Sequence, residues 1–175
     1  REGAIALAND ASDAILAVYE HAFEVEHKAD RSPLTAADLA AHHILVEGLE
    51  ALTPDIPVLS EEAAEDATWD VRRAWNRLWL VDPLDGTREF VKRNGEFTVN
   101  LALIEDGEVI FGVVQAPVTG QCWHGVRGGQ ALRREGNNEV ELRVRRPATA
   151  PLRVAGSRSH RDANTDAFIA RMGEV

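Results

Sequence analysis

The stretch LWLVDPLDGTREF, residues 78–90, restricts the possible folds more than any other part of the chain. Leu78 to Asp82 predicts a buried strand, because the run is short, apolar and followed by turn-forming residues. Asp82 and Asp85 then place two negative charges at the end of this strand. Carboxylates crowded in this way either share protons at a raised pKa or hold a cation between them.

A second acidic pair, Glu61-Glu62, directly follows a strand predicted at residues 56–60. If this strand lies beside the strand that ends at Asp82, the ends of both strands bring the carboxylates together. Several carboxylates without a nearby His or Cys form a hard oxygen site, which suits Mg²⁺ or Mn²⁺ better than zinc. The spacing therefore predicts a divalent-metal site.

The residues that follow Asp82 suit a phosphate beside such a metal. Pro83 stiffens the turn and lets Leu84 direct its carbonyl towards the metal, and Gly86 allows a tight bend. A short helix predicted at Thr87–Arg93 offers amide hydrogens at its N-terminus. Metal and amide donors together favour phosphate-ester hydrolysis. The alternative is a purely structural turn with Thr87 as a helix cap, and the upstream Ser-Glu-Glu favours the metal site over it.

The net charge of −10 disfavours nucleic acid polymers and anionic membranes as partners. An acidic chain that binds a small anionic substrate needs a local cation, which agrees with the predicted metal. A single cysteine, Cys122, allows no internal disulfide and suits a reducing compartment. The longest apolar runs are too short for a transmembrane segment.

Hydrophobic periodicity predicts an α+β layered domain with a largely antiparallel sheet flanked by helices. Asp106-Gly107 predicts a two-residue hairpin turn between two alternating strands. Helices are predicted at 2–20, 35–52 and 161–172, strands at 56–60, 78–81, 97–103, 109–115, 120–126, 139–145 and 152–155, and a loop at 26–34.

Asp38 has a structural explanation that needs no ligand. Thr35-Ala-Ala-Asp38 fits a capping box at the start of the second helix. Leu34 and Leu39 fit the hydrophobic staple that accompanies such a box. Capping therefore explains Thr35 and part of Asp38, and a second role for Asp38 can coexist with it.

Three segments resemble the inositol monophosphatase-like family of magnesium-dependent, lithium-sensitive phosphatases: DPLDGTREF, LSEE at 59–62, and SPLTAADLAAH at 32–42. Within this family, TPDIPVLSEE and VKRNGEFTVNLALI most resemble the CysQ-type 3'(2'),5'-bisphosphate nucleotidases. The resemblance implies the layered sandwich of the sugar phosphatases. It also implies removal of the 3'-phosphate from adenosine 3',5'-bisphosphate to leave AMP, in sulfate assimilation, and leaves the sulfated nucleotide open as a further substrate.

The resemblance also implies a role for each matching residue. Glu61 would bind a first Mg²⁺, Asp82 would bridge two ions, the Leu84 carbonyl would complete the first site, and Asp85 would hold the second. Mn²⁺ is an alternative ion, a third ion is open, and Li⁺ would inhibit.

For catalysis, the resemblance implies that Asp38 and Thr87 activate the attacking water and that Glu62 lies near a third ion or its waters. Substrate contacts are expected from Glu61, Leu84, Asp85, Gly86, Thr87, Ser157 and His160. The last two belong to the stretch GSRSH at 156–160.

One departure from the family concerns the second lobe, whose Trp-Asp motif has no counterpart after Val126. We therefore expect residues 1–175 to be an N-terminal metal-binding lobe without its C-terminal lobe. An inositol or sugar monophosphatase remains one alternative, and a non-catalytic metal- or phosphate-binding fragment another. A cytoplasmic location is expected, with peripheral inner-membrane association and a homodimer left open.

Overall fold

The computed structural model describes residues 1–21, 25–27, 33–144, 146–147, 151–156 and 161–172. The chain divides into two compact units, Arg1–Leu142 and Arg143–Val175. The second unit contains one described helix, α5 (Ala163–Ala170). No helix in the described ranges combines the length and the apolar character needed to cross a bilayer.

The first unit is built on one sheet of seven strands in the order β3-β4-β5-β6-β7-β8-β9. Only β3 and β4 are parallel, and the other neighbours are antiparallel. The α+β, largely antiparallel architecture is therefore confirmed. The strands are β3 (Val58–Ser60), β4 (Arg77–Asp85), β5 (Thr98–Glu105), β6 (Glu108–Ala116), β7 (Gln121–Val126), β8 (Ala131–Glu135) and β9 (Asn138–Leu142).

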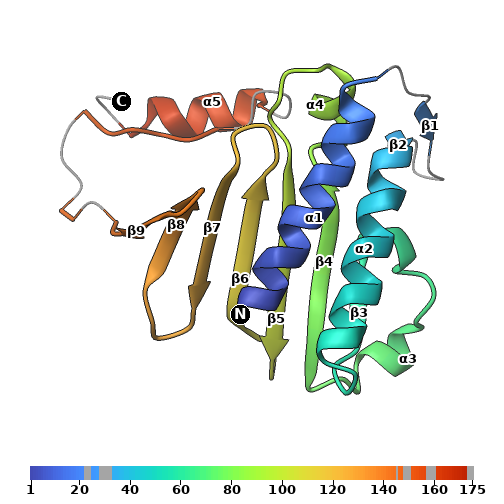
Figure 1. The fold of residues 1–175 in the computed structure, drawn as a ribbon. Helices are drawn as coiled ribbons and strands as arrows, with labels where there is room; N and C mark the ends of the chain where they lie inside the picture. The colour runs from blue at the N-terminus through green and yellow to red at the C-terminus, as the bar shows by residue number, and fades with distance from the viewer. Residues whose placement is uncertain (22–24, 28–32, 145, 148–150, 157–160, 173–175) are drawn as a thin grey trace. The chain divides into compact units, whose positions relative to one another are not determined.

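Two long helices cover one face of this sheet, α1 (Glu2–Tyr19) and α2 (Ala36–Leu52) (Figure 1). α1 lies over β5 and β6, and α2 lies over β3 and β4. Gly48 of α2 lets the helices approach closely, because a Cβ at this position would stand 2.2 Å from Cδ2 of Leu7. The core forms between the helices and the sheet, where Ala8, Leu45 and Val81 are almost fully buried.

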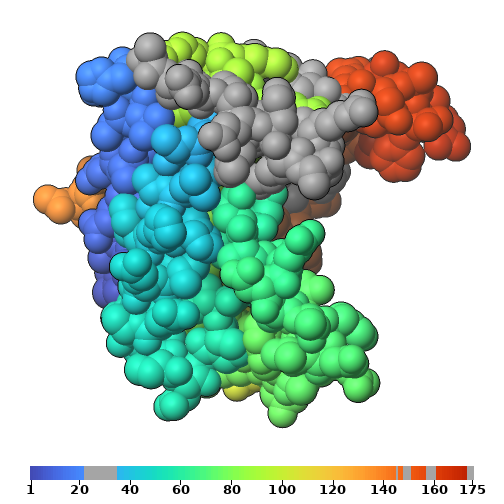
Figure 2. All heavy atoms as spheres, turned by 90° about the vertical axis from the view of Figure 1, so that its right-hand side faces the viewer, coloured from blue at the N-terminus to red at the C-terminus, as the bar shows by residue number. Residues whose placement is uncertain are grey.

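Shorter elements connect these layers. Segment 61–75 contains the 3₁₀ turn η1 (Glu61–Ala63) and α3 (Trp69–Arg72), and it lies beside α2 on one surface (Figure 2). α4 (Thr87–Val91) follows β4. The Asp106-Gly107 turn is confirmed, with φ of +50° and +77°, between paired Glu105 and Glu108.

Three predictions of secondary structure were wrong. The expected loop at 26–34 includes a short antiparallel pair, β1 (Val25–His27) with β2 (Pro33–Thr35). Residues 152–155 form no strand. The sequence prediction missed β8, where consecutive arginines interrupt the apolar alternation.

The physical reason for β8 lies in ion pairs rather than apolar packing. Arg134 contacts both carboxylate oxygens of Glu2, at 2.9 and 3.2 Å, and Glu139 at 2.9 Å. His124, whose side chain is fully buried, contacts Glu139 at 2.9 Å and Arg1 at 3.1 Å. These contacts join β7, β8 and β9 to the start of α1, which a search for hydrophobic periodicity does not detect.

We expect Leu45→Ala to lower the free energy of unfolding by about 2–5 kcal/mol, because it leaves a cavity in the core beneath α2. Leu39→Ala on the same helix is the matched control, since Leu39 is exposed to solvent. Its effect should stay within about 1 kcal/mol. Urea unfolding of both variants measures the difference, and equal effects would contradict the core described above.

Candidate metal and phosphate site

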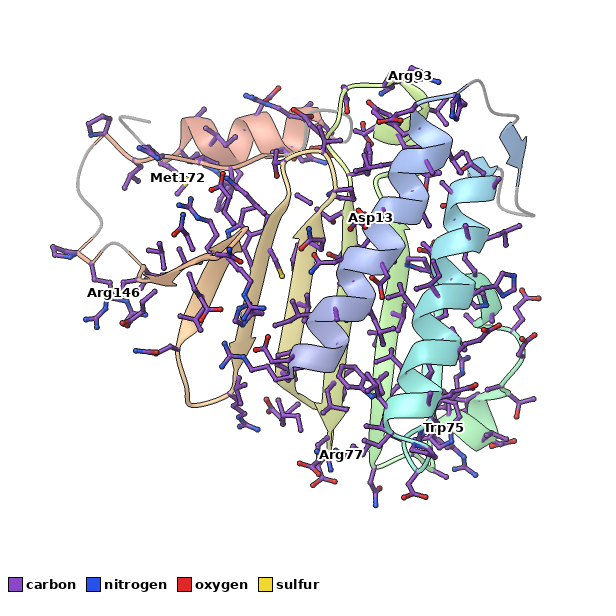
Figure 3. The ribbon with its side chains drawn as sticks, viewed as in Figure 1. Asp13, Trp75, Arg77, Arg93, Arg146 and Met172 are labelled. Atoms are coloured by element: carbon purple, nitrogen blue, oxygen red, sulfur yellow. The ribbon has the colours of Figure 1, made fainter. Side chains whose placement is uncertain are left out.

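The parallel pairing of β3 and β4 brings the acidic residues together. Ser60 is paired with Val81 in the register, so Glu61 and Asp82 follow neighbouring positions at the same edge of the sheet. The expectation that these two strands run side by side is confirmed. Figure 3 shows the direction of β4: Arg77, its first residue, and Arg93, beyond α4, lie at opposite ends of the sheet. The carboxylates therefore lie at the end that leads into α4.

A bulge between Asp82 and Asp85 shapes the strand end. The register with β5 shifts between these residues, and Pro83 contributes no N–H to the ladder. The Leu84 N–H donates to the Asp82 carboxylate, while the Leu84 carbonyl lies 3.2 Å from Thr87 Oγ1 and shares its single hydroxyl proton with Asp38 Oδ1, also at 3.2 Å. A carbonyl oxygen has two lone pairs, so the Leu84 oxygen retains capacity for a second partner.

Gly86 makes the turn into α4 possible. Its φ of +93° is a left-handed conformation, and a Cβ there would stand 2.9 Å from the Glu96 carbonyl oxygen. α4 is then held by its buried Phe90, whose ring lies 5.1 Å from that of Tyr19 and 5.2 Å from that of Phe97. The turn that carries Thr87 is therefore attached to the core at both ends.

Asp38 is brought to this turn from the first turn of α2. It is buried, and its Oδ2 accepts the Thr35 N–H at 2.8 Å and the Thr35 hydroxyl at 2.6 Å. Its Oδ1 accepts from Thr87 Oγ1 at 3.2 Å. The capping box is confirmed, and the same carboxylate also contacts the turn after β4. The two roles expected for Asp38 are thus compatible in one geometry, whereas the Leu34 side chain of the staple lies outside the described residues.

The environment of Asp82 is unfavourable for a negative charge. The pKa of Asp82 is raised to about 7, first by burial and then by the charges of Glu61 and Asp85 and a hydrogen bond with Glu61. Its Oδ1 is buried without a hydrogen-bond partner. An unpartnered carboxylate oxygen between two other carboxylates is a place where a cation would relieve both desolvation and repulsion.

The donor set fits a hard divalent cation. Glu61, Asp82 and Asp85 offer only oxygen atoms, which agrees with Mg²⁺ rather than zinc. As the side chains stand, the described residues contain no group of three or more His, Cys, Asp or Glu already arranged around one metal position. The ligand roles predicted for Glu61, Asp82, Leu84 and Asp85 therefore remain predictions that the local chemistry supports.

Two further sets of residues were predicted to belong to the site: Glu62, and the pair Ser157 and His160. Glu62 lies in η1 directly after Glu61 and is half-buried, and its role near a third ion is not tested. Ser157 and His160, the expected substrate contacts in GSRSH, lie outside the described residues.

One residue near the site was not predicted. Asn100 of β5 donates from Nδ2 to Asp85 Oδ2 at 3.2 Å. In the sequence, Asn100 could have been noticed as a polar residue at an alternate position of the otherwise apolar strand FTVNLALI. Without the pairing of β4 with β5, nothing indicated that this asparagine lies beside the acidic residues.

A hollow of about 740 Å³ adjoins the acidic residues on the sheet face opposite α1 and α2. Glu61, Asp82 and Asn100 are among its polar lining residues. Apolar side chains form most of the remainder, among them Leu80, Val114, Trp123 and Leu142.

Comparison with known proteins agrees with this geometry. Residues 1–174 match the inositol monophosphatase family. The chain is 52% identical to the 3'(2'),5'-bisphosphate nucleotidase CysQ of Escherichia coli O157:H7 over 170 residues, which are 96% of this chain and 67% of that protein.

Two solved structures are also similar. The crystal structure of CysQ from Bacteroides thetaiotaomicron superimposes with a TM-score of 0.76 at 37% identity, covering 98% of this chain and 67% of the other. The Thermotoga maritima IMPase superimposes with a TM-score of 0.69 at 28% identity, covering 82% and 53%. The fold and the motif-bearing segments are therefore shared with these proteins.

The raised pKa of Asp82 predicts a pH-dependent stability in the presence of EDTA. The folded protein keeps a proton up to about pH 7, whereas the unfolded chain releases it near 3.8. The free energy of unfolding should therefore fall as the pH rises through this interval and level off above it. Asp82→Asn should remove that dependence, so the variant gains stability over the wild type with rising pH.

Urea unfolding between pH 5 and pH 8 measures this difference. Asp55→Asn, which removes an exposed carboxylate before β3, is the control and should leave the pH dependence unchanged. A difference between wild type and Asp82→Asn that does not vary with pH would show that the Asp82 carboxyl is not perturbed.

Proposed function

The chain belongs to the inositol monophosphatase family, and on this premise we propose that it acts on adenosine 3',5'-bisphosphate, removing the 3'-phosphate in a Mg²⁺-dependent reaction that leaves AMP. The curated relatives at 51–52% identity are named 3'(2'),5'-bisphosphate nucleotidases. The observation that carries the proposal is the buried, unpartnered Asp82 oxygen between Glu61 and Asp85, next to the Asp38–Thr87 hydrogen bond.

Glu61, Asp82, Asp85 and the Leu84 carbonyl would hold the Mg²⁺, and a second ion would share Asp82. Bound there, Mg²⁺ would supply Lewis-acid polarisation of the phosphate ester and neutralise charge on the leaving oxygen. The amides of Gly86 and Thr87 would orient the phosphate oxygens. The number of ions, the use of Mn²⁺ and inhibition by Li⁺ are parts of this proposal.

Thr87 and Asp38 would move the proton from the attacking water. The Thr87 hydroxyl proton is shared between Asp38 Oδ1 and the Leu84 carbonyl, so the hydroxyl oxygen has lone pairs free to accept from a water. As the water attacks, its proton passes to Thr87 Oγ1 while the Thr87 proton passes to Asp38 Oδ1. The capping contacts hold Asp38 Oδ2 in place and leave Oδ1 for this transfer.

The substrate preference within the family is the finer part of the proposal. The chain spans 67% of the length of its 52% identical relative, and Ser157 and His160, proposed nucleotide contacts, lie outside the described residues. An inositol or sugar monophosphatase therefore remains the alternative, and a binding fragment without activity is the alternative of another class. The expected sulfated nucleotide, homodimer, cytoplasmic location and membrane association remain predictions.

The test is phosphate release, measured on the whole protein as the cell makes it. Adenosine 3',5'-bisphosphate should be hydrolysed faster than inositol 1-phosphate, and only when Mg²⁺ is present. Faster hydrolysis of inositol 1-phosphate would favour the alternative substrate, and the same assay on residues 1–175 decides whether this segment alone is active.

Asp38→Asn should reduce kcat by about 10²–10⁴-fold, because the amide cannot take the proton from Thr87. Thr35→Ala is the matched control: it removes the helix cap, at about 1 kcal/mol of stability, but leaves Asp38 Oδ1 facing Thr87. It should keep kcat within several-fold of the wild type. Equal losses in the two variants would mean that Asp38 acts only through the helix cap.

A further inference from the structure

Asn100 lies directly opposite Asp82 in the antiparallel register of β4 and β5. Paired residues of neighbouring strands direct their side chains to the same face, and both residues line the hollow opposite α1 and α2. Asn100 is therefore the direct cross-strand neighbour of Asp82, whose Oδ1 has no hydrogen-bond partner.

The two ends of the Asn100 amide have different partners. Its Nδ2 donates to Asp85 Oδ2 at 3.2 Å, so it orients a second acidic residue three positions beyond Asp82. Its Oδ1 is buried and has no hydrogen-bond partner. The Asn100 side chain thus donates to the Asp85 carboxylate, and it has an unpartnered acceptor oxygen on the residue that is paired with Asp82.

Asn100 Oδ1 and Asp82 Oδ1 are both buried acceptors without a partner, on directly paired residues. When Asp82 is ionised, neither of these two oxygens can satisfy the other, since neither carries a proton. A cation that keeps part of its hydration shell satisfies both, because the carboxylate can bind the ion while the amide oxygen accepts from a water around it.

We propose that Asn100 is a positioning residue of the divalent-metal site: Nδ2 fixes the orientation of the Asp85 carboxylate, and Oδ1 accepts a hydrogen bond from the hydration shell of the cation. This inference rests on the proposed metal-dependent function. An amide suits both tasks, because it donates and accepts without adding a negative charge beside Glu61, Asp82 and Asp85.

The test compares Asn100→Leu with the wild type in the whole protein as the cell makes it. Loss of a residue that orients metal ligands typically weakens metal binding about 10–100-fold. We therefore expect the calorimetric Kd for Mg²⁺ to rise by roughly that factor, and the increase of Tm on adding Mg²⁺ to shrink. The Tm in EDTA should stay close to that of the wild type, because the substitution removes one hydrogen bond to Asp85 but also removes a buried oxygen without a partner, and the new side chain is of similar size.

Gln115→Leu is the matched control. Gln115 is also a buried amide whose Oε1 has no partner, but it lies on the opposite face of the sheet, on β6. Its replacement should leave the Kd for Mg²⁺ unchanged. Asn100→Thr, which is too short to reach Asp85 and suits a strand, provides the same test if Asn100→Leu does not fold.

The outcomes separate this inference from the proposed function. If Mg²⁺ binds and stabilises the wild type but the Asn100 variants have the same Kd, Asn100 does not position the site and the proposed function stands. If Mg²⁺ neither binds nor stabilises the wild type, the metal-dependent function itself is wrong. If Asn100→Leu and Gln115→Leu weaken Mg²⁺ binding equally, the effect is a general one of the sheet and the inference fails.

Discussion

The site depends on the register of the single parallel strand pair in the described sheet. Pairing of Ser60 with Val81 ends β3 and β4 at the same edge, so Glu61 and Asp82 become neighbours. Burial, together with the charges of Glu61 and Asp85, raises the pKa of Asp82 to about 7. Such an arrangement opposes folding when the carboxylates are ionised, and a divalent cation held there would offset that effect, so binding and stability would be linked.

A second constraint joins the helical layer to the strand end. Asp38 uses one carboxylate oxygen for the capping box of α2 and the other for Thr87 after β4. Because the cap fixes the side chain, the position of Thr87 relative to the acidic residues depends on how α2 packs on the sheet. Gly86 and the aromatic contacts of Phe90 hold the other side of that turn.

Local patterns predicted those parts of the fold in which neighbouring residues decide the structure. The capping box at Thr35, the Asp106-Gly107 turn and the helix predicted at 2–20 are confirmed. β8 was missed because Arg134 is held by ion pairs to Glu2 and Glu139, and Glu2 is distant in sequence. Asn100 was missed for the same reason, since its partner Asp85 belongs to the neighbouring strand.

By itself, the sequence determined the acidic motif, its turn residues and the resemblance that identifies the family, because residue type and spacing are local properties. Only the tertiary structure decided that Asp82 is half-buried with a buried oxygen left unpartnered, that Asp38 reaches Thr87, and that Asn100 lies opposite Asp82. The physical reason is that burial and strand register depend on contacts between segments far apart in the chain, whereas a motif specifies only which groups are available to meet.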